Sequence, residues 1–221
     1  MNFTAISDLH GNLITSKEFQ GETLLIGGDL MPFQDHSLQY QEYWFKSVFV
    51  PWLNYLKFKT IIFIAGNHDF YFENLKITDI QSQLPQHVHY LQNTSIDLQG
   101  YKIYGSPWIL QCGKWAFSAN ENILNSKFSN FQSCNILLTH GPAFGFCDTV
   151  LQFNQTENLG SQALLQIIKL QPPEYVLNGH IHSGSHIPIN CNFGNKITKF
   201  VGVSYLDDRM FPNYKPFKFK L

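Results

Sequence analysis

The chain has 221 residues, of which 44% are hydrophobic and 15% aromatic, which excludes a disordered protein and suits one domain, residues 1–221, with a substantial core. Its formal net charge is −1 with a single arginine, Arg209, so it lacks the basic surface of a protein that grips long nucleic acid. No apolar run approaches the roughly 18 residues of a membrane span. A polar motif begins at residue 8, so we expect no removable leader, no membrane contact and a cytoplasmic location.

Short apolar runs recur along the chain, and each is too short for a helix. They predict buried strands over residues 3–7, 23–27, 60–65, 135–139 and 175–178. A hairpin is expected over residues 95–105, turning at Gln99-Gly100, and a further strand over residues 196–204. In the tail, Lys215, Lys218 and Lys220 alternate with Phe217 and Phe219, as in a terminal strand with one solvated face.

Helical patterns lie between these strands. Residues 37–56 form a long aromatic-rich pattern, in which Pro51 should start a new helix or kink this one. Residues 161–170 offer a serine N-cap and end before Pro172-Pro173. Together these elements predict a four-layer α/β/β/α sandwich, with two mixed sheets inside and helices outside. Residues 108–133 are the least regular and suit a long functional loop or a partner surface.

Five motifs made of metal-ligand residues follow five of the predicted strands. They are Asp8-Leu9-His10, Gly28-Asp29, Gly66-Asn67-His68-Asp69, His140-Gly141 and Gly179-His180-Ile181-His182. Taken singly, each has an ordinary explanation as a turn residue or a hydrogen-bonded histidine at a strand end. In open α/β sheets, however, ligands collect beyond the carboxyl ends of the strands, where all five motifs fall. Carboxylate, amide and imidazole groups in this arrangement indicate two divalent metals side by side, and such pairs hydrolyse phosphate esters.

The nine histidines divide into two groups. Five belong to the motifs, and among these His180 and His182 alternate along what we expect to be an extended chain, which would point both to the same side. The other four are expected on the surface or in loops: His36, His87, His89 and His186. Of these, His186 is near enough to His182 in sequence to line the site.

The order of the motifs resembles that of the calcineurin-like metallophosphoesterases, and the resemblance spans residues 8–182. The match is closer to one branch, the metallophosphoesterase-domain (MPPED, or 239AB-like) group. It extends beyond the metal motifs to residues 90–92, 100–108 and 139–146 and to Asp148. Cys147 is a departure, since several relatives have a basic residue at this position.

The resemblance implies a role for each motif residue. Asp8, His10 and His182 would bind the first metal, and Asp29 would bridge both metals. The second metal would be bound by the remaining ligands, Asn67, His140 and His180. The same comparison makes His68 the residue that contacts the scissile phosphate and protonates the leaving oxygen, with Asp69 as a catalytic neighbour that orients rather than ligates.

Elementary chemistry agrees with these roles. Two divalent ions, two carboxylates and one hydroxide leave a charge of about +1, which attracts phosphate. Metal coordination lowers the pKa of water from roughly 16 to near 7, so a metal-bridging hydroxide is available for attack at neutral pH. In-line attack needs an acid opposite, and His68 is the only motif imidazole that the metals leave free. Nitrogen and oxygen ligands, with no cysteine expected nearby, suit Mn²⁺ first, and Fe or Zn²⁺ next.

The substrate is less well defined by the sequence. Phosphomonoesterases often add cationic groups to hold a dianion, and the single arginine therefore favours a small phosphodiester, which carries one negative charge. Relatives in the group hydrolyse phosphodiesters, including cyclic nucleotides. Trp108, Phe144 and Phe146, together with Asn67 and His68, are the expected substrate contacts, although the three aromatic residues would serve equally well as core under the loops.

Two alternatives remain open. A phosphomonoesterase or a pyrophosphohydrolase would use the same site. A non-catalytic nucleotide-binding protein would keep the fold without turnover, but such versions lose ligands, whereas every expected ligand is present here. The chain is expected to be a monomer or a homodimer.

Overall fold

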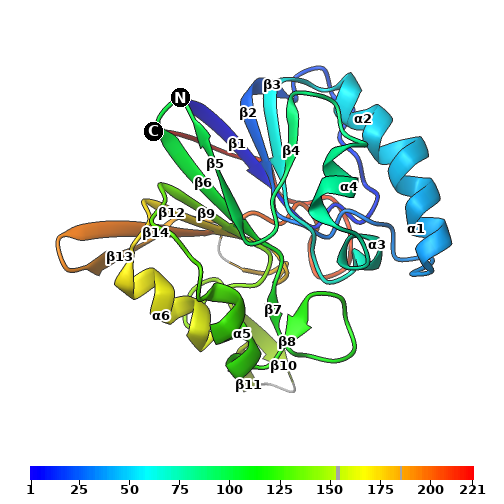
Figure 1. The fold of residues 1–221 in the computed structure, drawn as a ribbon. Helices are drawn as coiled ribbons and strands as arrows, with labels where there is room; N and C mark the ends of the chain where they lie inside the picture. Colours follow the sequence, from blue (N-terminus) through cyan, green and yellow to red (C-terminus); the bar gives the residue numbers. More distant parts are fainter. Residues whose placement is uncertain (153–154, 185) are drawn as a thin grey trace.

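The computed structural model describes residues 1–152, 155–184 and 186–221. Two large β-sheets face each other, and helices cover the outer face of each (Figure 1). The predicted four-layer α/β/β/α sandwich is thus confirmed. In the described part of the chain, no helix has both the length and the apolar character needed to cross a membrane.

The first sheet has five strands in the order β15-β1-β2-β3-β4. Four are parallel: β1 (Asn2–Ile6), β2 (Gln20–Ile26), β3 (Lys57–Phe63) and β4 (Val88–Tyr90). The tail forms β15 (Phe217–Lys220), which runs antiparallel to β1 and alternates half-buried phenylalanines with exposed lysines, as the sequence predicts.

The second sheet has six strands in the order β13-β14-β12-β9-β6-β5. Its four inner strands are parallel, and the two edge strands are antiparallel. In chain order the strands are β5 (Thr94–Leu98), β6 (Tyr101–Ser106), β9 (Ile136–Thr139), β12 (Tyr175–Asn178), β13 (Ile189–Phe193) and β14 (Lys196–Gly202). The predicted hairpin joins β5 to β6, and positive φ at Gln99 and Gly100 matches the twist of the strands.

Helices α1 (Leu38–Trp44) and α2 (Val50–Tyr55) cover the first sheet and are joined by a π-helical turn, η1 (Phe45–Phe49). Pro51 lies in the first turn of α2, where its missing N–H interrupts the α-helical hydrogen-bond pattern, so the predicted new start is confirmed. The shorter α3 (Phe70–Glu73) and α4 (Ile77–Gln81) complete this layer.

The second sheet is covered by α5 (Glu121–Phe128) and α6 (Gln162–Leu170). Ser161 caps α6 as predicted, accepting a hydrogen bond from the Leu164 N–H at 3.2 Å. Helix α5 lies within residues 108–133, the segment that the sequence pattern indicates is the least regular. The same segment holds a small ribbon of β7 (Ile109–Leu110) and β8 (Ser118–Ala119), and a second ribbon pairs β10 (Thr149–Gln152) with β11 (Gln155–Asn158).

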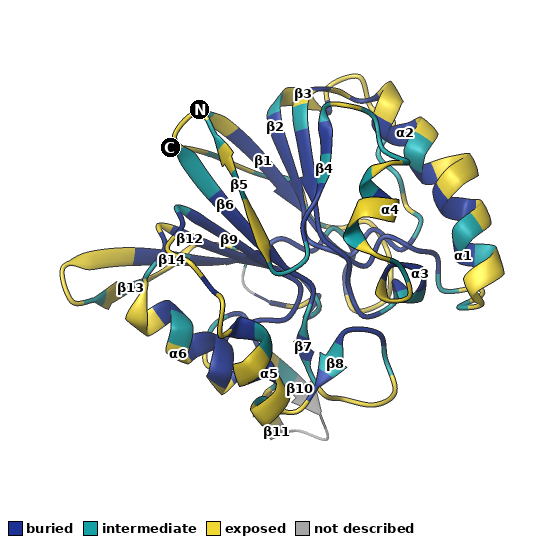
Figure 2. Cartoon of the chain, in the orientation of Figure 1, coloured by how far each residue is buried: buried dark blue, intermediate teal, exposed yellow. Residues whose placement is uncertain are grey.

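The core has three parts that match the layers, and Figure 2 shows the central strands buried towards their C-terminal ends. Along β2, Leu24 and Ile26 pack towards the helices of the first sheet, whereas Leu25 between them packs between the two sheets. This alternation is the period-two pattern of a strand with both faces buried. It explains why the sequence showed short, continuous apolar runs.

Candidate metal centre

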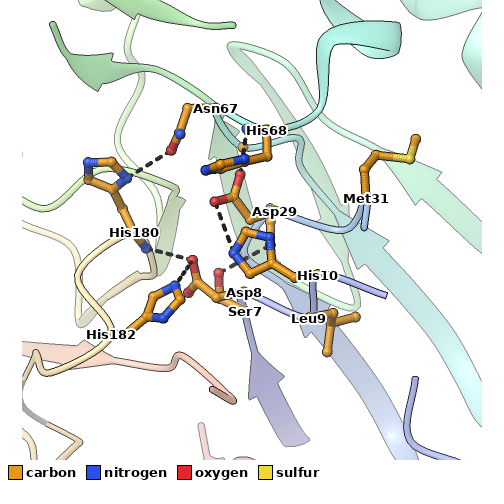
Figure 3. A network of polar contacts seen from close by, with 12 residues as sticks. Ser7, Asp8, Leu9, His10, Asp29, Met31, Asn67, His68, His180 and His182 are labelled. Atoms are coloured by element: carbon orange, nitrogen blue, oxygen red, sulfur yellow. Dashed lines mark hydrogen bonds and ion pairs between the residues drawn. The ribbon is translucent and has the colours of Figure 1, made fainter. Parts of the chain in front are cut away.

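All five predicted motifs lie in turns that follow parallel strands, and their side chains converge on one site. Figure 3 shows residues of four of them, from Asp8 to His182. Strands β1, β2 and β3 of the first sheet lead into three of them, and β9 and β12 of the second sheet lead into the other two. The sheets are joined at this point, because the Ser7 N–H donates to the Val203 carbonyl and the Tyr205 N–H donates to the Ser7 carbonyl, each at 2.8 Å. The two sheets therefore supply the site together.

Four of the seven proposed ligands have left-handed backbones, with φ of 54° at Asp8, 41° at His10, 51° at Asp29 and 67° at His180. Such conformations are uncommon for residues with a Cβ and cost on the order of 1–3 kcal/mol each. The surrounding contacts must hold them. Each turn reverses the chain at the end of a strand and leaves the side chain facing the common space.

Two glycines allow the turns to approach each other closely. A Cβ at Gly66 would collide with the carboxylate of Asp29, and a Cβ at Gly179 would collide with that of Asp8. Only glycine leaves room for a carboxylate against the backbone at these positions.

The first cluster contains Asp8, His10 and His182, whose ligand atoms lie within 4.8 Å of one another. His182 Nε2 lies 3.5 Å from Asp8 Oδ1, and its Nδ1 lies 3.1 Å from the Asp207 carbonyl. That second contact fixes the ring and leaves Nε2 facing the carboxylate. The other oxygen of Asp8 accepts a hydrogen bond from Ser204 Oγ at 2.6 Å.

Asp29 lies at the centre of the site. Its Oδ2 is 3.5 Å from His10 Nε2 and 3.3 Å from His140 Nε2, so it faces both clusters. Its Oδ1 accepts a hydrogen bond from the His68 backbone N–H at 2.8 Å. Asp8, Asp29 and His140 form a second group with ligand atoms within 4.8 Å. A carboxylate that bridges two ions has to lie in such a central position.

Asn67 joins the two remaining histidines. Its Oδ1 is 2.9 Å from His140 Nε2 and 2.8 Å from His180 Nδ1. His140 Nδ1 lies 2.8 Å from the Gly27 carbonyl, which again leaves Nε2 to face the site. The structure thus brings together the three residues that the sequence assigned to a second metal.

The expected extended conformation at His180 and His182 is wrong. Strand β12 ends at Asn178, and His180 has a φ of 67°, which turns the chain. The two imidazoles therefore face different partners, with His180 beside Asn67 and His182 beside Asp8.

The buried carboxylates are compensated by imidazoles. Burial raises the pKa of Asp8, but its hydrogen bond to His182 and the charge of that ring outweigh burial, and the net pKa is lowered. At Asp29 burial is likewise outweighed by the charge and hydrogen bond of His140, and the pKa of this carboxyl is also lowered. Conversely, burial lowers the pKa of His140 and His182, but the carboxylates raise the pKa of each to about 9.

The other two histidines among the proposed ligands, His10 and His180, have no carboxylate contact strong enough to outweigh burial. Burial, partly offset by Asp29, lowers the pKa of His10 to about 4. Burial and the charge of His140 lower the pKa of His180 to about 4. Without metal, the site therefore combines two protonated and two neutral imidazoles near neutral pH.

Asp69 points away from the cavity and joins two of the turns. Its carboxylate accepts backbone hydrogen bonds from Leu30, Met31 and Gly66 at 2.7–3.2 Å. Burial and the charge of Asp29 raise the pKa of Asp69 to about 7, although the three backbone hydrogen bonds act to lower it. The contacts fix the turn after β3 against the turn after β2.

The donor set fits two divalent cations. It consists of carboxylate and amide oxygens and imidazole nitrogens, which suit borderline and hard metals. Asp8 and Asp29 are 0% and 2% exposed, and their ion-pair partners in the described part of the chain are all histidines. Cations placed between these groups would take over the role of the imidazole protons. Cys112 lines the neighbouring cavity, which corrects the expectation that no cysteine lies near, but the two ligand groups contain none.

A cavity of about 290 Å³ opens over this cluster. Besides the candidate ligands, its lining includes Trp115, Val150, Ile181 and Met210, together with Asp208. Among the described residues that line it, none is a lysine or an arginine. The lining therefore combines apolar side chains with groups that could bind metal.

The three aromatic residues expected to contact substrate do not line this cavity. Phe146 stacks on Phe200 with ring centroids 3.9 Å apart, and Phe144 packs against the core beneath α5 and α6. Trp108 lies between two core clusters, with Lys127 Nζ 4.2 Å from its ring centroid. These three residues pack against the core, and Trp115 is the aromatic residue outside the histidine motifs that lines the cavity.

Sequence reasoning missed Trp115 and His36 as site residues. Trp115 lies in the irregular segment, and its ring centroid is 4.4 Å from that of His68. His36, expected on the surface or in a loop, lies in the loop before α1 and contacts His68. No spacing pattern links residues so far apart in the chain. His186 stacks on Tyr214 and is absent from the cavity lining, in contrast to the suggestion from its proximity to His182.

Residues 1–184 match the calcineurin-like phosphoesterase family. The chain belongs to this family. Calcineurin-like phosphoesterases depend on two metal ions, and both the fold and the two ligand groups agree with membership.

Individual members of the calcineurin-like family are distant from this chain. Human metallophosphoesterase domain-containing protein 1 is 28% identical over 207 residues, which cover 82% of this chain and 60% of the human protein. Protein TT1561 of Thermus thermophilus superposes with a TM-score of 0.57 at 16% identity over 94% of both chains. Phosphopantetheinyl hydrolase of Mycobacterium tuberculosis has a TM-score of 0.52 at 13% identity, covering 92% of this chain and 89% of its own. These two structures establish the fold alone.

We expect Asp29→Asn to weaken both metal sites together, because one amide cannot replace a carboxylate that faces both clusters. Metal content after dialysis should fall from about two ions per chain to below about one. The exposed Asp79→Asn serves as the matched control and should retain both ions. Two tightly held ions in Asp29→Asn would rule out a bridging role.

Metal binding at about pH 8 should release protons, since His140 and His182 are protonated without metal and must be neutral to ligate. Because the pKa of each is raised to about 9, both carry a proton below that pH, and the release should fade as the pH rises above it. Calorimetric titration with Zn²⁺ in buffers of different ionisation enthalpy measures this release, which we expect to reach at least about two protons per chain. A binding enthalpy independent of the buffer would contradict the assignment.

Proposed function

We propose that this chain is a dinuclear metal-dependent phosphodiesterase that hydrolyses small phosphodiesters. The observation that carries the proposal is a buried cluster of nitrogen and oxygen groups, drawn from both sheets, at a cavity whose lining also includes apolar side chains. Membership of the calcineurin-like family supports hydrolysis of phosphate esters. We infer one domain over residues 1–221 and a cytoplasmic location.

In this proposal, Asp8, His10 and His182 hold one ion, while Asn67, His140 and His180 hold the other. Asp29 contacts both. When bound, the two ions supply positive charge for the substrate phosphate and a water of lowered pKa as nucleophile. Mn²⁺ is the first choice, with Fe or Zn²⁺ as alternatives, because the ligands are imidazoles and hard oxygens.

His68 is the proposed general acid. Its backbone is fixed on both sides, since its N–H donates to Asp29 Oδ1 at 2.8 Å and its carbonyl accepts from Gln41 Nε2 at 2.7 Å. Its Nδ1 is occupied by His36, so Nε2 is the ring nitrogen left to face a substrate. A proton on Nε2 would pass to the leaving oxygen as the ester bond breaks. Asp69 would maintain the turn that carries His68 by its three backbone contacts.

The charge of the cavity supports a diester over a monoester. A phosphodiester carries one negative charge, whereas a monoester is mostly a dianion at neutral pH. Asp208 at the rim repels additional negative charge, and no cationic side chain among the described lining residues offsets it. Trp115 and Met210 offer an apolar surface for an aryl group or a nucleobase, so cyclic nucleotides fit the proposed class.

The proposal is tested with metal-stripped protein to which Mn²⁺ is added back. Bis-p-nitrophenyl phosphate should be hydrolysed, with kcat/KM at least about tenfold above that for p-nitrophenyl phosphate. The ratio follows because the second negative charge of the monoester has no cationic side chain to pair with. Turnover should require about two ions per chain. Faster hydrolysis of the monoester would indicate a phosphomonoesterase, and bound metal without turnover on either compound would indicate a nucleotide-binding protein.

His68→Asn should keep both ions and lose about 100-fold or more in kcat, because general acid catalysis contributes on that scale. Metal analysis and steady-state kinetics on the diester check the two parts separately. His87→Asn, a histidine outside the cavity lining, is the matched control and should retain wild-type kcat. Loss of metal from His68→Asn would make His68 a ligand instead.

A further inference from the structure

A second histidine contacts the imidazole of His68. His36 Nε2 lies 3.1 Å from His68 Nδ1, and 32 positions separate the two residues in the chain. His36 belongs to the loop between β2 and α1, is half-buried, and is absent from the cavity lining. It therefore contacts the imidazole without reaching the substrate space.

We propose that His36 is a positioning residue, which accepts the Nδ1–H of His68 and thereby fixes the ring orientation and the neutral tautomer, so that Nε2 faces the cavity and holds the transferable proton when the ring is protonated. The catalytic consequence rests on the proposed hydrolytic function. The contact between the two rings does not, and it can be tested by itself.

Apolar packing alone cannot orient the His68 ring. Trp115 lies against it at 4.4 Å between centroids, and the rings of Phe33 and His10 meet it nearly at right angles, each at 5.0 Å. These contacts restrict the plane of the ring. A half-turn of the imidazole about its bond to Cβ, however, exchanges nitrogen for carbon with almost no change in shape. Only a polar partner distinguishes the two orientations, and His36 is positioned to do so.

His36 is itself held in place. Its ring centroid lies 5.4 Å from that of Phe70 and 5.6 Å from that of Trp115, which it meets at 84°. The next residue, Ser37, caps α1 by accepting from the Tyr40 N–H, and the Ser37 N–H donates to Asp35 Oδ1 at 2.7 Å. The start of the helix thus anchors the loop that carries His36.

The proton balance defines the role of His36. Before transfer, His68 carries a proton on each nitrogen and donates Nδ1–H to the lone pair of His36 Nε2. As the phosphorus–oxygen bond breaks, the Nε2–H bond of His68 also breaks and an O–H bond forms on the leaving group. His68 is left neutral with its proton on Nδ1, still donated to His36. His36 keeps the same protonation throughout, so it does not act as a catalytic residue.

The dependence of rate on the leaving group tests this role. Methyl p-nitrophenyl phosphate releases a stable phenolate that needs little protonation, whereas methyl phenyl phosphate releases a more basic oxygen that needs an acid. In the Mn²⁺-loaded enzyme, His36→Ala should lower kcat on the phenyl ester by about tenfold or more, and on the nitrophenyl ester by less than about threefold. KM should change little for either. His36→Gln, whose amide oxygen can accept from Nδ1–H, should recover part of the loss.

Two controls distinguish a positioning role of His36 from a general loss of folded structure in the variant. His87→Ala removes a distant imidazole and should leave both rates unchanged. In a His68→Asn background, His36→Ala should cause no further loss on the phenyl ester, since the two residues act through one path. An equal loss on both esters, or an additive loss in the double variant, would overturn the proposal.

The tautomer can be measured without turnover. Two-bond ¹⁵N–¹H spectra of the diamagnetic Zn²⁺-loaded protein should show neutral His68 protonated on Nδ1 in the wild type and shifted towards Nε2–H in His36→Ala. The same tautomer in both proteins would overturn the proposal. If the wild type hydrolysed neither ester, the proposed function would fail, and the spectra would still decide whether His36 sets the state of His68.

Discussion

The rest of the structure depends on two carboxylates, Asp8 and Asp29, buried near one another. An unpaired buried charge costs several kcal/mol, and like charges repel, so the protein must surround this pair with positive charge or protons. Histidines do this in the protein alone, and the pKa values of His140 and His182 rise as a result. Divalent cations would do it better, because each brings two charges and accepts several ligands at once. The need to compensate these two buried charges also excludes apolar side chains at the proposed ligand positions.

The sandwich architecture follows from supplying ligands on both sides of this pair. One sheet can present only a row of side chains at its edge, whereas two facing sheets enclose a space. The sheets are joined at Ser7, whose backbone contacts Val203 and Tyr205, in the segment that follows β14 of the second sheet. They are joined again where His140 Nδ1 meets the Gly27 carbonyl at 2.8 Å. The contacts that orient the ligands are thus also the contacts that hold the layers together, which couples the stability of the fold to the geometry of the site.

The sequence predicted the features that depend on local pattern. Short apolar runs located the strands, Gln99-Gly100 located a hairpin, and Ser161 located the start of a helix. The motifs located side chains that the fold brings together in one site, because side chains after parallel strands share one edge. What could not be predicted depends on the path of loops. His180 leaves the extended conformation, and Trp115 lines the cavity, whereas Trp108 does not. Neither leaves a periodic signal, since loop paths are set by tertiary contacts.

The proposed acid and the proposed metal ligands are connected through one side chain. Asp29 faces both ligand clusters with Oδ2 and accepts the His68 backbone N–H with Oδ1. A shift of this carboxylate on binding two ions therefore moves the backbone of the proposed acid as well. The His68 ring keeps a separate restraint through His36, which belongs to the loop anchored by α1 rather than to the metal cluster. The backbone position of the proposed acid is thus tied to Asp29, while the orientation of its ring has a further restraint in His36.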